Sequence, residues 1–369
     1  MPTWRVEWTR TSTGTVFMTQ VSLPVARLAA LATALPPHVL DQADVMRAGR
    51  GLFGAAFGDV ERLVAVYANA GIERRHSCVP LEWYLSDHGF SERNELFLEH
   101  AVALFTEAAG RALADAGLRP VDIDAIVAVS TTGIATPSLD ALLMEKMPFR
   151  RDVMRLPIFG LGCAGGVVGL ARAAAMARAE PGSKVLYLCA ELCGLTFRHV
   201  DRSKSNFIAT ALFGDGAAAA VIATDGDGPS LDAWGEHTWP DSLDVMGWNV
   251  LDDGFGVLFS RDIPALVRER FRGVAEAFLS RHGLGFDDID EYLCHPGGAK
   301  VIAALGDALE LEPERLCLSR DVLRDCGNMS AVTVLFVLER ALRRRLSGKM
   351  LLSALGPGFT AAFLVMDVA

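Results

Sequence analysis

The feature that most constrains the fold of this chain is an internal repeat. Residues 105–130 (FTEAAGRALADAGLRPVDIDAIVAVS) align without a gap with residues 271–296 (FRGVAEAFLSRHGLGFDDIDEYLCHP). Each segment has the pattern of an amphipathic helix, a Gly-Leu stop, a short acidic turn and an apolar strand. Two copies of one supersecondary plan in a single chain indicate a duplication.

A second pair of segments supports the duplication. Residues 212–225 (LFGDGAAAAVIATD) and 354–367 (ALGPGFTAAFLVMD) both carry Gly-x-Gly, then Ala-Ala, then an apolar strand closed by Asp. Between these anchors each half has a Gly-rich turn that leads into a long helix, at 160–179 and at 326–345. Alternating strands and helices favour a parallel-rich sheet covered on both faces. We therefore predict two α/β halves, residues 19–228 and 229–369.

Composition limits the class of protein. With 369 residues, 51% of them hydrophobic, the chain can bury a large core without a metal or a disulfide. The formal charge of −10 argues against nucleic-acid and anionic-membrane surfaces. No apolar run approaches the ~18–20 residues that span a bilayer, so integral membrane association is not expected. The seven cysteines lack zinc-ligand spacing, which predicts reduced thiols in a cytoplasmic protein and no metal site.

The N-terminal segment, residues 1–18, stands apart from the periodic sequence. It is polar, rich in threonine and lacks the apolar stretch of a signal peptide. We predict a disordered extension here. The alternative is that Met18 is the true start.

Cys163 is the candidate nucleophile. It lies in a Gly-rich string, FGLGCAGG at 159–166, between a short apolar segment and a predicted helix at 167–179. The unpaired N–H groups and the dipole of a helix start stabilise a thiolate, so the pKa of Cys163 is expected to be lowered. The alternative is a small core cysteine at a helix start.

His295 and Asn328 are the candidate partners of this cysteine. His295 ends the strand of the second repeat, and Asn328 opens the second-half helix at the position equivalent to Cys163. Taken singly, His295 could be a structural hydrogen-bonder and Asn328 an ordinary helix cap. The duplication instead brings nucleophile, proton carrier and amide donor to one pocket. A thiolate paired with an imidazolium could then attack an acyl thioester, and the histidine and amide could stabilise the enolate of a decarboxylating extender.

These motifs together resemble one family. The strings at 162–166 (GCAGG), 212–216 (LFGDG), 295–298 (HPGG), 327–330 (GNMS) and 356–358 (GPG) are similar in order and spacing to type III polyketide synthases, the chalcone-synthase-like family, from about Val21 onward. The resemblance implies a thiolase fold, with duplicated βαβαβ halves in a five-layered αβαβα architecture. It implies that Cys163 carries the acyl group and that His295 and Asn328 drive malonyl decarboxylation and condensation.

The resemblance also implies a gate, a cavity and a homodimer. Phe213 corresponds to a gatekeeper between the coenzyme A tunnel and the cavity, and Val257 aligns with a second gatekeeper that is usually phenylalanine. Thr136 matches a position where plant relatives place a methionine that reaches into the partner subunit's cavity. The other implied cavity positions are Thr131, Thr132, Cys193, Thr196 and Ser330.

Coenzyme A binding is less visible in the sequence. The family places basic residues on an early helix, but here only Arg62 matches, and the other positions hold Ala65 and Asn69. Arg74 and Arg75 are further candidates, or they belong to a solvated turn. Gly297 and Gly298 would let the pantetheine arm pass close to the backbone. Acyl-CoA and malonyl-CoA are the implied substrates, with no other cofactor.

Small residues at the gate and cavity wall favour a long, flexible starter. The string STTGIATP at 130–137 is closest in pattern to bacterial alkylpyrone and alkylresorcinol synthases. We therefore hypothesise that a medium- or long-chain fatty acyl-CoA is condensed with malonyl-CoA by decarboxylative Claisen condensation to give these products. The alternatives are a single condensation like that of a ketoacyl-carrier-protein synthase III, and a non-catalytic partner subunit.

Overall fold

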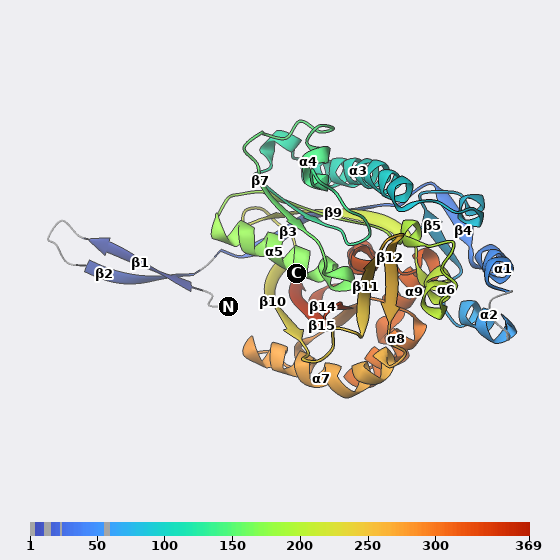
Figure 1. Ribbon diagram of the computed structural model, residues 1–369. Coiled ribbons are helices and arrows are strands. Elements are labelled where there is room, and N and C mark those ends of the chain that lie inside the picture. The colour runs from blue at the N-terminus through green and yellow to red at the C-terminus, as the bar shows by residue number, and fades with distance from the viewer. Residues whose placement is uncertain (1–3, 11–15, 23, 55–59) are drawn as a thin grey trace.

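The computed structural model describes residues 4–10, 16–22, 24–54 and 60–369, with side chains described for 24–54 and 64–369. At the N-terminus β1 (Trp4–Arg10) and β2 (Val16–Ser22) form an antiparallel hairpin that projects from the body of the molecule (Figure 1). Residues 4–10 and 16–18 of the predicted disordered extension therefore form strands, and the rest of 1–18 lies outside the described residues. Both segments mix β-branched or aromatic residues with polar ones, which is a strand pattern.

One nine-stranded sheet organises the rest of the chain. Its order is β13-β14-β15-β10-β3-β9-β8-β6-β7. The first half supplies β3 (Ala26–Ala34), β6 (Ala125–Val129), β7 (Met154–Ile158), β8 (Val185–Leu192) and β9 (Asp215–Ala223). The second supplies β10 (Ser230–Thr238), β13 (Glu291–Cys294), β14 (Gly348–Gly356) and β15 (Thr360–Val368).

The two halves of this sheet repeat the same pairing. From β3 outward the pairs β3·β9 and β9·β8 are antiparallel and β8·β6 is parallel, and from β10 outward β10·β15 and β15·β14 are antiparallel and β14·β13 is parallel. The halves join where Ala26 and Arg27 pair with Leu231 and Ser230. The predicted duplication is therefore visible in the strand order.

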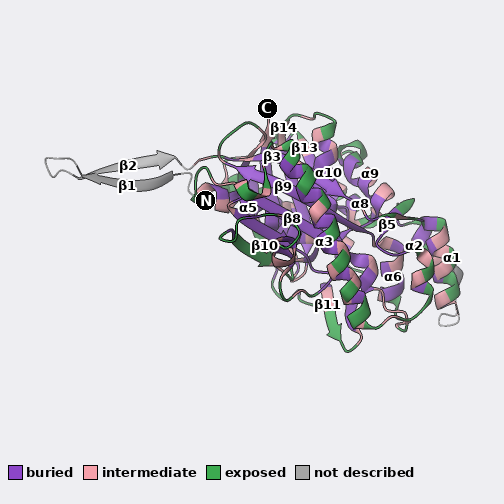
Figure 2. Cartoon of the chain, turned by 90° about the horizontal axis from the view of Figure 1, so that it is seen from above, coloured by how far each residue is buried: buried purple, intermediate pink, exposed green. Residues whose placement is uncertain are grey.

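Five layers follow from the helices. The long helix α3 (Phe90–Asp115) covers the outer face of the first half, and α7 (Ile263–Arg281) and α8 (Ala299–Leu309) cover that of the second. Helices α5 (Gly165–Ala179) and α10 (Thr333–Arg343) share one apolar core with the inner faces of both halves. Strands β6, β8 and β9 are wholly buried, whereas α3 has a buried and an exposed face (Figure 2). The predicted thiolase fold, αβαβα, is confirmed.

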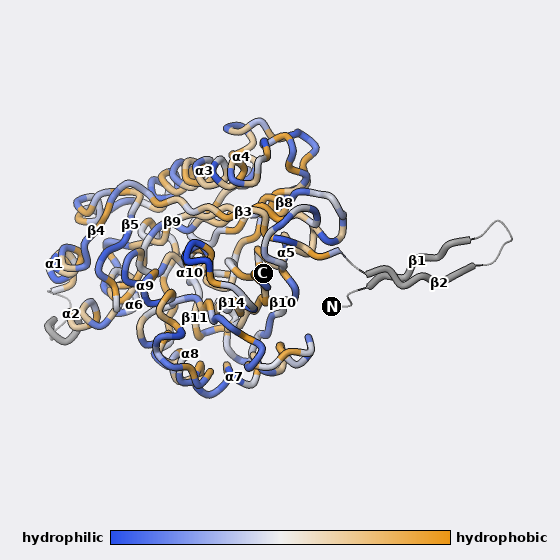
Figure 3. Tube along the Cα trace, turned by 180° about the vertical axis from the view of Figure 1, so that it is seen from behind, coloured by the Kyte–Doolittle hydropathy of each residue, from blue (hydrophilic) through white to orange (hydrophobic). Residues whose placement is uncertain are grey.

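The remaining elements gather at one end of the sheet (Figure 1). They are α1 (Gln42–Phe53), α2 (Val60–Ala68), α6 (Lys204–Leu212), α9 (Cys317–Cys326), the β4/β5 pair (His38–Asp41 and Arg74–Ser77) and the β11/β12 hairpin (Met246–Leu251 and Gly254–Phe259). A short helix, α4 (Leu139–Leu143), lies beside α3. The outer helices α7 and α8 alternate hydrophobic and hydrophilic residues along the trace (Figure 3). In the described part of the chain, we find no helix with the length and apolar character to cross a membrane.

Candidate active site

Cys163 sits in a single 3-10 turn, Gly162–Ala164, that leads directly into α5. Gly162 has a φ of +46°, and a Cβ there would lie 2.6 Å from Pro357, so the turn requires glycine. The Gly162 N–H donates to Thr131 Oγ1 at 3.2 Å. These contacts fix the nucleophile between the end of β6 and the Gly-Pro-Gly loop of the second half.

His295 directly follows β13, where its N–H donates to the carbonyl of Ser353 at 2.8 Å. Its side chain is only 4% exposed, and neither ring nitrogen has a hydrogen-bond partner among the described residues. A buried imidazole with two unpaired nitrogens is costly. Both ring nitrogens of His295 can therefore form hydrogen bonds with a substrate.

Asn328 lies between two helices rather than inside one. The segment 326–345, predicted as a Gly-rich turn that leads into a helix, contains the end of α9 at Cys326, the turn with Asn328 and α10 from Thr333. Gly327, with a φ of +70°, turns the chain between them. The Asn328 Nδ2 donates to the Gly297 carbonyl at 3.2 Å, and its Oδ1 accepts from Ser330 N–H at 2.8 Å. Both contacts fix the amide orientation.

Cys163, His295 and Asn328 line one pocket of about 480 Å³, the active-site pocket. Its walls include α2, α6, α8 and the end of β12, and Gly297 and Gly298 are part of its lining. The structure therefore brings the three predicted groups together, one from the first half and two from the second.

Burial is the main influence on the pKa values of Cys163 and His295. Burial raises the pKa of Cys163 to about 12, and nearby Glu191 raises it further, while contacts with Ser330 and Asn328 lower it only in part. Burial lowers the pKa of His295 to about 3. Desolvation thus opposes the charged form of both groups and works against the effect of the helix start. A neutral imidazole can act as the base when the thiol attacks.

Glu191 is a site residue that the sequence analysis missed. It is fully buried at the end of β8, and its Oε2 accepts from Thr131 N–H at 2.9 Å and Thr132 Oγ1 at 2.8 Å. Burial raises its pKa to about 7, although these bonds and one from Ser330 oppose the rise. Ser330 Oγ also lies 3.7 Å from Cys163 Sγ. The sequence signal that could have identified Glu191 is that it is the one acidic residue in the otherwise apolar strand 185–192.

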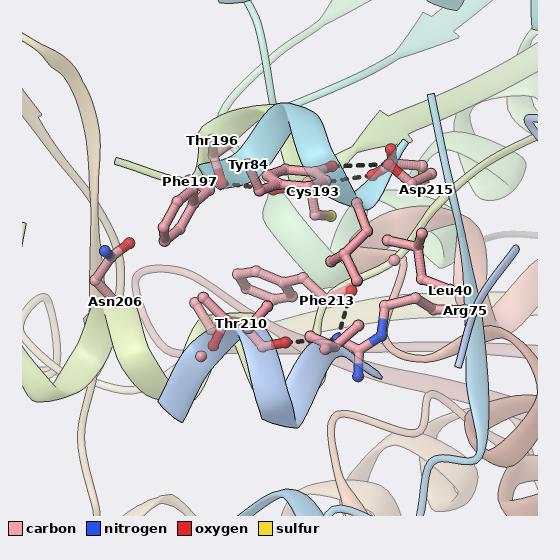
Figure 4. Close-up of a pocket in the computed structure, with 18 of the residues that line it drawn as sticks. Leu40, Arg75, Tyr84, Cys193, Thr196, Phe197, Asn206, Thr210, Phe213 and Asp215 are labelled. Carbon is pink, nitrogen blue, oxygen red and sulfur yellow. Dashed lines mark hydrogen bonds between the residues drawn. The ribbon is translucent and has the colours of Figure 1, made fainter. Parts of the chain in front are cut away.

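A second, smaller cavity of about 70 Å³, the inner pocket, contacts Phe213 (Figure 4). Cys193, Thr196 and Val257 line it, as expected for cavity positions. Apolar side chains of α1 are part of its lining, including Val45, Leu52 and Phe53.

Aromatic residues of the β11/β12 hairpin frame Phe213. Its ring centroid lies 5.7 Å from that of Phe259 and 6.3 Å from that of Trp248. Trp248 is opposite Val257 in the hairpin, and its Nε1 donates to the Thr131 carbonyl at 2.9 Å. Phe213 thus borders the inner pocket, with Phe259 in the lining of the active-site pocket beside it. The sequence analysis did not identify Trp248.

Arg75 holds the backbone of Phe213, the predicted gatekeeper, through hydrogen bonds. It is 3% exposed, and its Nη1 donates to the carbonyls of Thr210 at 2.7 Å and Phe213 at 3.0 Å (Figure 4). Its Nη2 donates to the Ala211 carbonyl and to Gln42. Arg75 therefore caps the end of α6, and neither a solvated turn nor a coenzyme A contact describes it.

The remaining predicted cavity and coenzyme A residues either line neither pocket or have side chains outside the described residues. Thr131 and Thr132 are buried against Glu191 and do not appear in the lining of either pocket. Thr136 is exposed, on the loop after β6, outside both pockets of its own chain. Arg62 lies in the backbone of α2, but its side chain is outside the described residues.

The fold and the converged Cys, His and Asn define a condensing enzyme of the thiolase fold. The family of chalcone and stilbene synthases matches the chain with its N-terminal domain at residues 84–226 and its C-terminal domain at 233–368. This chain belongs to that family and is a type III polyketide synthase, an acyltransferase that condenses malonyl-CoA.

Named relatives agree with this assignment. A 1,3,6,8-tetrahydroxynaphthalene synthase of Streptomyces peucetius subsp. caesius is 41% identical over 349 residues, 92% of each chain. An alpha-pyrone synthesis polyketide synthase-like protein of Mycobacterium tuberculosis is 30% identical over 363 residues, 93% of this chain and 91% of the relative. The crystal structure of the tetrahydroxynaphthalene synthase of Streptomyces coelicolor A3(2) superposes with a TM-score of 0.89 at 30% identity, covering 93% of this chain and 99% of that one.

Proposed function

We propose that this enzyme extends a medium- or long-chain fatty acyl-CoA starter with malonyl-CoA and releases an alkylpyrone or an alkylresorcinol. The observation that carries this proposal is the apolar inner pocket bordered by Phe213. Its walls are mainly aliphatic and aromatic, and such a surface favours an alkyl chain over a polar starter. The pocket is only about 70 Å³ as it stands, so a tail requires the Phe213 ring to turn aside.

The proposed reaction begins with transfer of the starter to Cys163. The sulfur attacks the thioester carbonyl, His295 accepts the thiol proton, and that proton leaves with the sulfur of free coenzyme A. The site then holds an acyl thioester and a neutral histidine.

Malonyl-CoA then occupies the active-site pocket. As its carboxylate leaves as CO2, the electron pair forms an enolate, whose oxygen accepts hydrogen bonds from His295 and the Asn328 amide. The enolate carbon attacks the acyl carbonyl, a carbon–carbon bond forms, and the bond from that carbonyl to Cys163 breaks, which releases the cysteine as a thiolate. The lengthened chain is then attached to coenzyme A and can return to Cys163 for another round. We propose that no cofactor other than these thioesters takes part.

A second candidate product class comes from the most similar relative described above. Its name gives tetrahydroxynaphthalene, a bicyclic product without an alkyl chain, and a small inner pocket is compatible with a malonyl-derived starter. The two candidates differ in whether an alkyl tail must enter the inner pocket.

Purified protein incubated with malonyl-CoA, alone and with acyl-CoA starters of increasing length, tests both. Alkyl tri- or tetraketide pyrones or resorcinols, read by mass spectrometry, support the alkyl proposal. A naphthalene product from malonyl-CoA alone, with no starter incorporated, contradicts it. A single ketoacyl product formed only from a carrier-protein malonate would contradict both. In the Cys163→Ala variant, a mass increase on incubation with starter would refute the assigned nucleophile.

We also propose a homodimer that uses the β7 edge of the sheet. β7 is the edge strand of the nine-stranded sheet on the side of the first half. Met154, Leu156 and Phe159 at this edge are 36–58% exposed, which is an unusual exposure for large apolar side chains. The exposed loop with Thr136 follows β6, the strand that pairs with β7. Analytical ultracentrifugation at micromolar concentration measures this directly, and a monomer would contradict the proposal. A cytoplasmic location stays a prediction.

A further inference from the structure

Arg93 is a buried arginine that joins three segments of the chain beside the inner pocket. It lies in the first turn of α3 and is only 4% exposed. Its Nε donates to the His88 carbonyl at 3.1 Å, and its Nη1 donates to the Phe197 carbonyl at 3.0 Å. Its Nη2 donates to the carbonyl of Asp253, in the turn of the β11/β12 hairpin. Because a buried charge is costly unless it is hydrogen-bonded, these three carbonyls are held around the guanidinium.

The β11/β12 hairpin depends on such anchors for its position. Its two strands pair with each other and, in the described part of the chain, with no other strand. A lone two-stranded hairpin is only marginally stable in water. Trp248 anchors one strand through the Thr131 carbonyl at 2.9 Å. The turn is anchored at Asp253, whose carbonyl accepts from Arg93 and whose carboxylate accepts from Arg198 Nε at 2.8 Å.

Two parts of the inner-pocket wall are attached to Arg93. One is the segment 193–197, whose side chains lie beside Phe213 in Figure 4. The other is Val257 of β12, the strand that follows the anchored turn. Arg93 itself lines neither the inner pocket nor the active-site pocket. It can therefore act on a substrate only through the walls that it holds.

We infer that Arg93 is a positioning residue that sets the separation between the segment 193–197 and the β11/β12 hairpin, and thereby the length of starter that the inner pocket accepts. This inference rests on the proposed entry of a starter into that pocket. The guanidinium is a rigid planar fork, so its bonds hold Phe197 and Asp253 at a fixed separation. One methylene more or less in an apolar pocket changes kcat/KM by about 10- to 200-fold, and this discrimination requires walls that stay in place.

Starter selectivity tests the inference. Arg93→Met removes the three donated bonds and keeps an unbranched apolar side chain. Both proteins receive malonyl-CoA with a ladder of acyl-CoA starters, and selectivity is the kcat/KM of the best starter divided by that of the starter two carbons longer. This ratio should fall by at least about fivefold. Arg93→Lys keeps the charge without the fork and should give an intermediate ratio. A ratio in Arg93→Met within twofold of the wild type would overturn the inference.

Hydrogen exchange of the hairpin gives a second measurement that needs no turnover. In Arg93→Met, amides in peptides covering residues 246–259 should exchange about tenfold faster, whereas those of β9 in the central sheet should keep their wild-type rate. A general loss of stability would instead accelerate exchange in both places and would contradict a positioning role. Unchanged exchange in the hairpin would contradict it as well.

Gly254→Ala perturbs the same contact from the side of the hairpin and leaves every charge in place. Gly254 has a φ of +120°, and a Cβ there would lie 3.0 Å from Arg93 Nη2. This variant should also lower the selectivity ratio and accelerate exchange in the hairpin. It keeps the inference testable if Arg93→Met does not fold, and wild-type values of both quantities would overturn the inference.

Arg111→Met is the matched control. Arg111 lies on the same helix, its Nη1 donates to the Thr33 carbonyl at 2.6 Å, and it lines neither pocket. The substitution should leave the selectivity ratio and the exchange of the hairpin unchanged. Changes as large as those of Arg93→Met would assign the effect to α3 as a whole and overturn the inference.

Failure of the proposed function has a different signature. If the wild type incorporates no acyl starter, the proposed function is wrong, and selectivity is then the distribution of product lengths formed from malonyl-CoA alone. A broader distribution in Arg93→Met, together with faster exchange in the hairpin, would still support the positioning role. An unchanged distribution would overturn it.

Discussion

Replacing Glu191 with glutamine should change how the stability of the protein depends on pH. The pKa of this buried carboxyl is raised to about 7 from its ordinary value of 4.5. The folded state therefore holds a proton that the unfolded chain has lost between these two values. The resulting contribution to stability is fully present below about pH 4.5 and disappears as the pH rises to 7. The difference corresponds to about 3 kcal/mol.

Glutamine resembles the protonated acid in shape and cannot ionise. It keeps an oxygen for the bonds from Thr131 and Thr132, and its amide takes the place of Oε1. The cost of burying this amide does not vary with pH. Glu191→Gln should therefore gain about 3 kcal/mol relative to wild type between pH 5 and pH 8.

Urea unfolding of both proteins at several pH values, followed by fluorescence at fixed protein concentration, measures this difference. Asp215, whose pKa burial raises to about 6, is present in both proteins and cancels in the comparison. Glu107→Gln, at an exposed position on α3, controls for the loss of one charge. A wild-type minus variant difference that stays constant from pH 5 to pH 8 would refute the reasoning, because Glu191 would then be ionised or hydrated in the folded protein.

Three other predictions concern the nucleophile, the gate and the dimer. Alkylation of Cys163 by iodoacetamide, followed by peptide mass, should keep accelerating up to about pH 10, because its pKa is about 12; a plateau near pH 7 would show a preformed thiolate. Arg75→Met should lower the free energy of unfolding by about 2–4 kcal/mol, because buried carbonyls lose their donor. Arg74→Met, which removes an exposed ion pair at 3.6 Å, should change it by less than about 1 kcal/mol in the same unfolding assay. Thr136→Trp should shorten the longest accepted starter in a ladder assay if the loop reaches a partner's cavity, and an unchanged chain-length profile would contradict this.

The sequence was most informative where the duplication constrained it. The matched segments 105–130 and 271–296 contain β6 and β13, which occupy equivalent places in the two halves of the sheet. This equivalence predicted that Cys163, His295 and Asn328 converge, although each alone had an ordinary structural interpretation. All three line the same pocket.

What the sequence could not predict depends on burial and on long-range proximity. The helix start at Cys163 suggested a lowered pKa, but the extent of desolvation is known only once both halves close over the sulfur. The carbonyls of Phe197 and Asp253, which Arg93 joins, are far apart in the chain, and no local pattern relates them. Arg75 follows another arginine in a polar stretch, where its burial has no local signal.

Because the catalytic groups are divided between the two halves, the activity of the enzyme depends on how the halves are positioned relative to each other. Cys163 belongs to the first half and His295 and Asn328 to the second, and the halves meet through the shared core around α5 and α10. A small slippage between the halves would separate sulfur from imidazole and amide while leaving each half's strands and helices intact. Turnover should therefore fail on heating before secondary structure is lost, and the gap between the two midpoints would report how firmly the halves are docked.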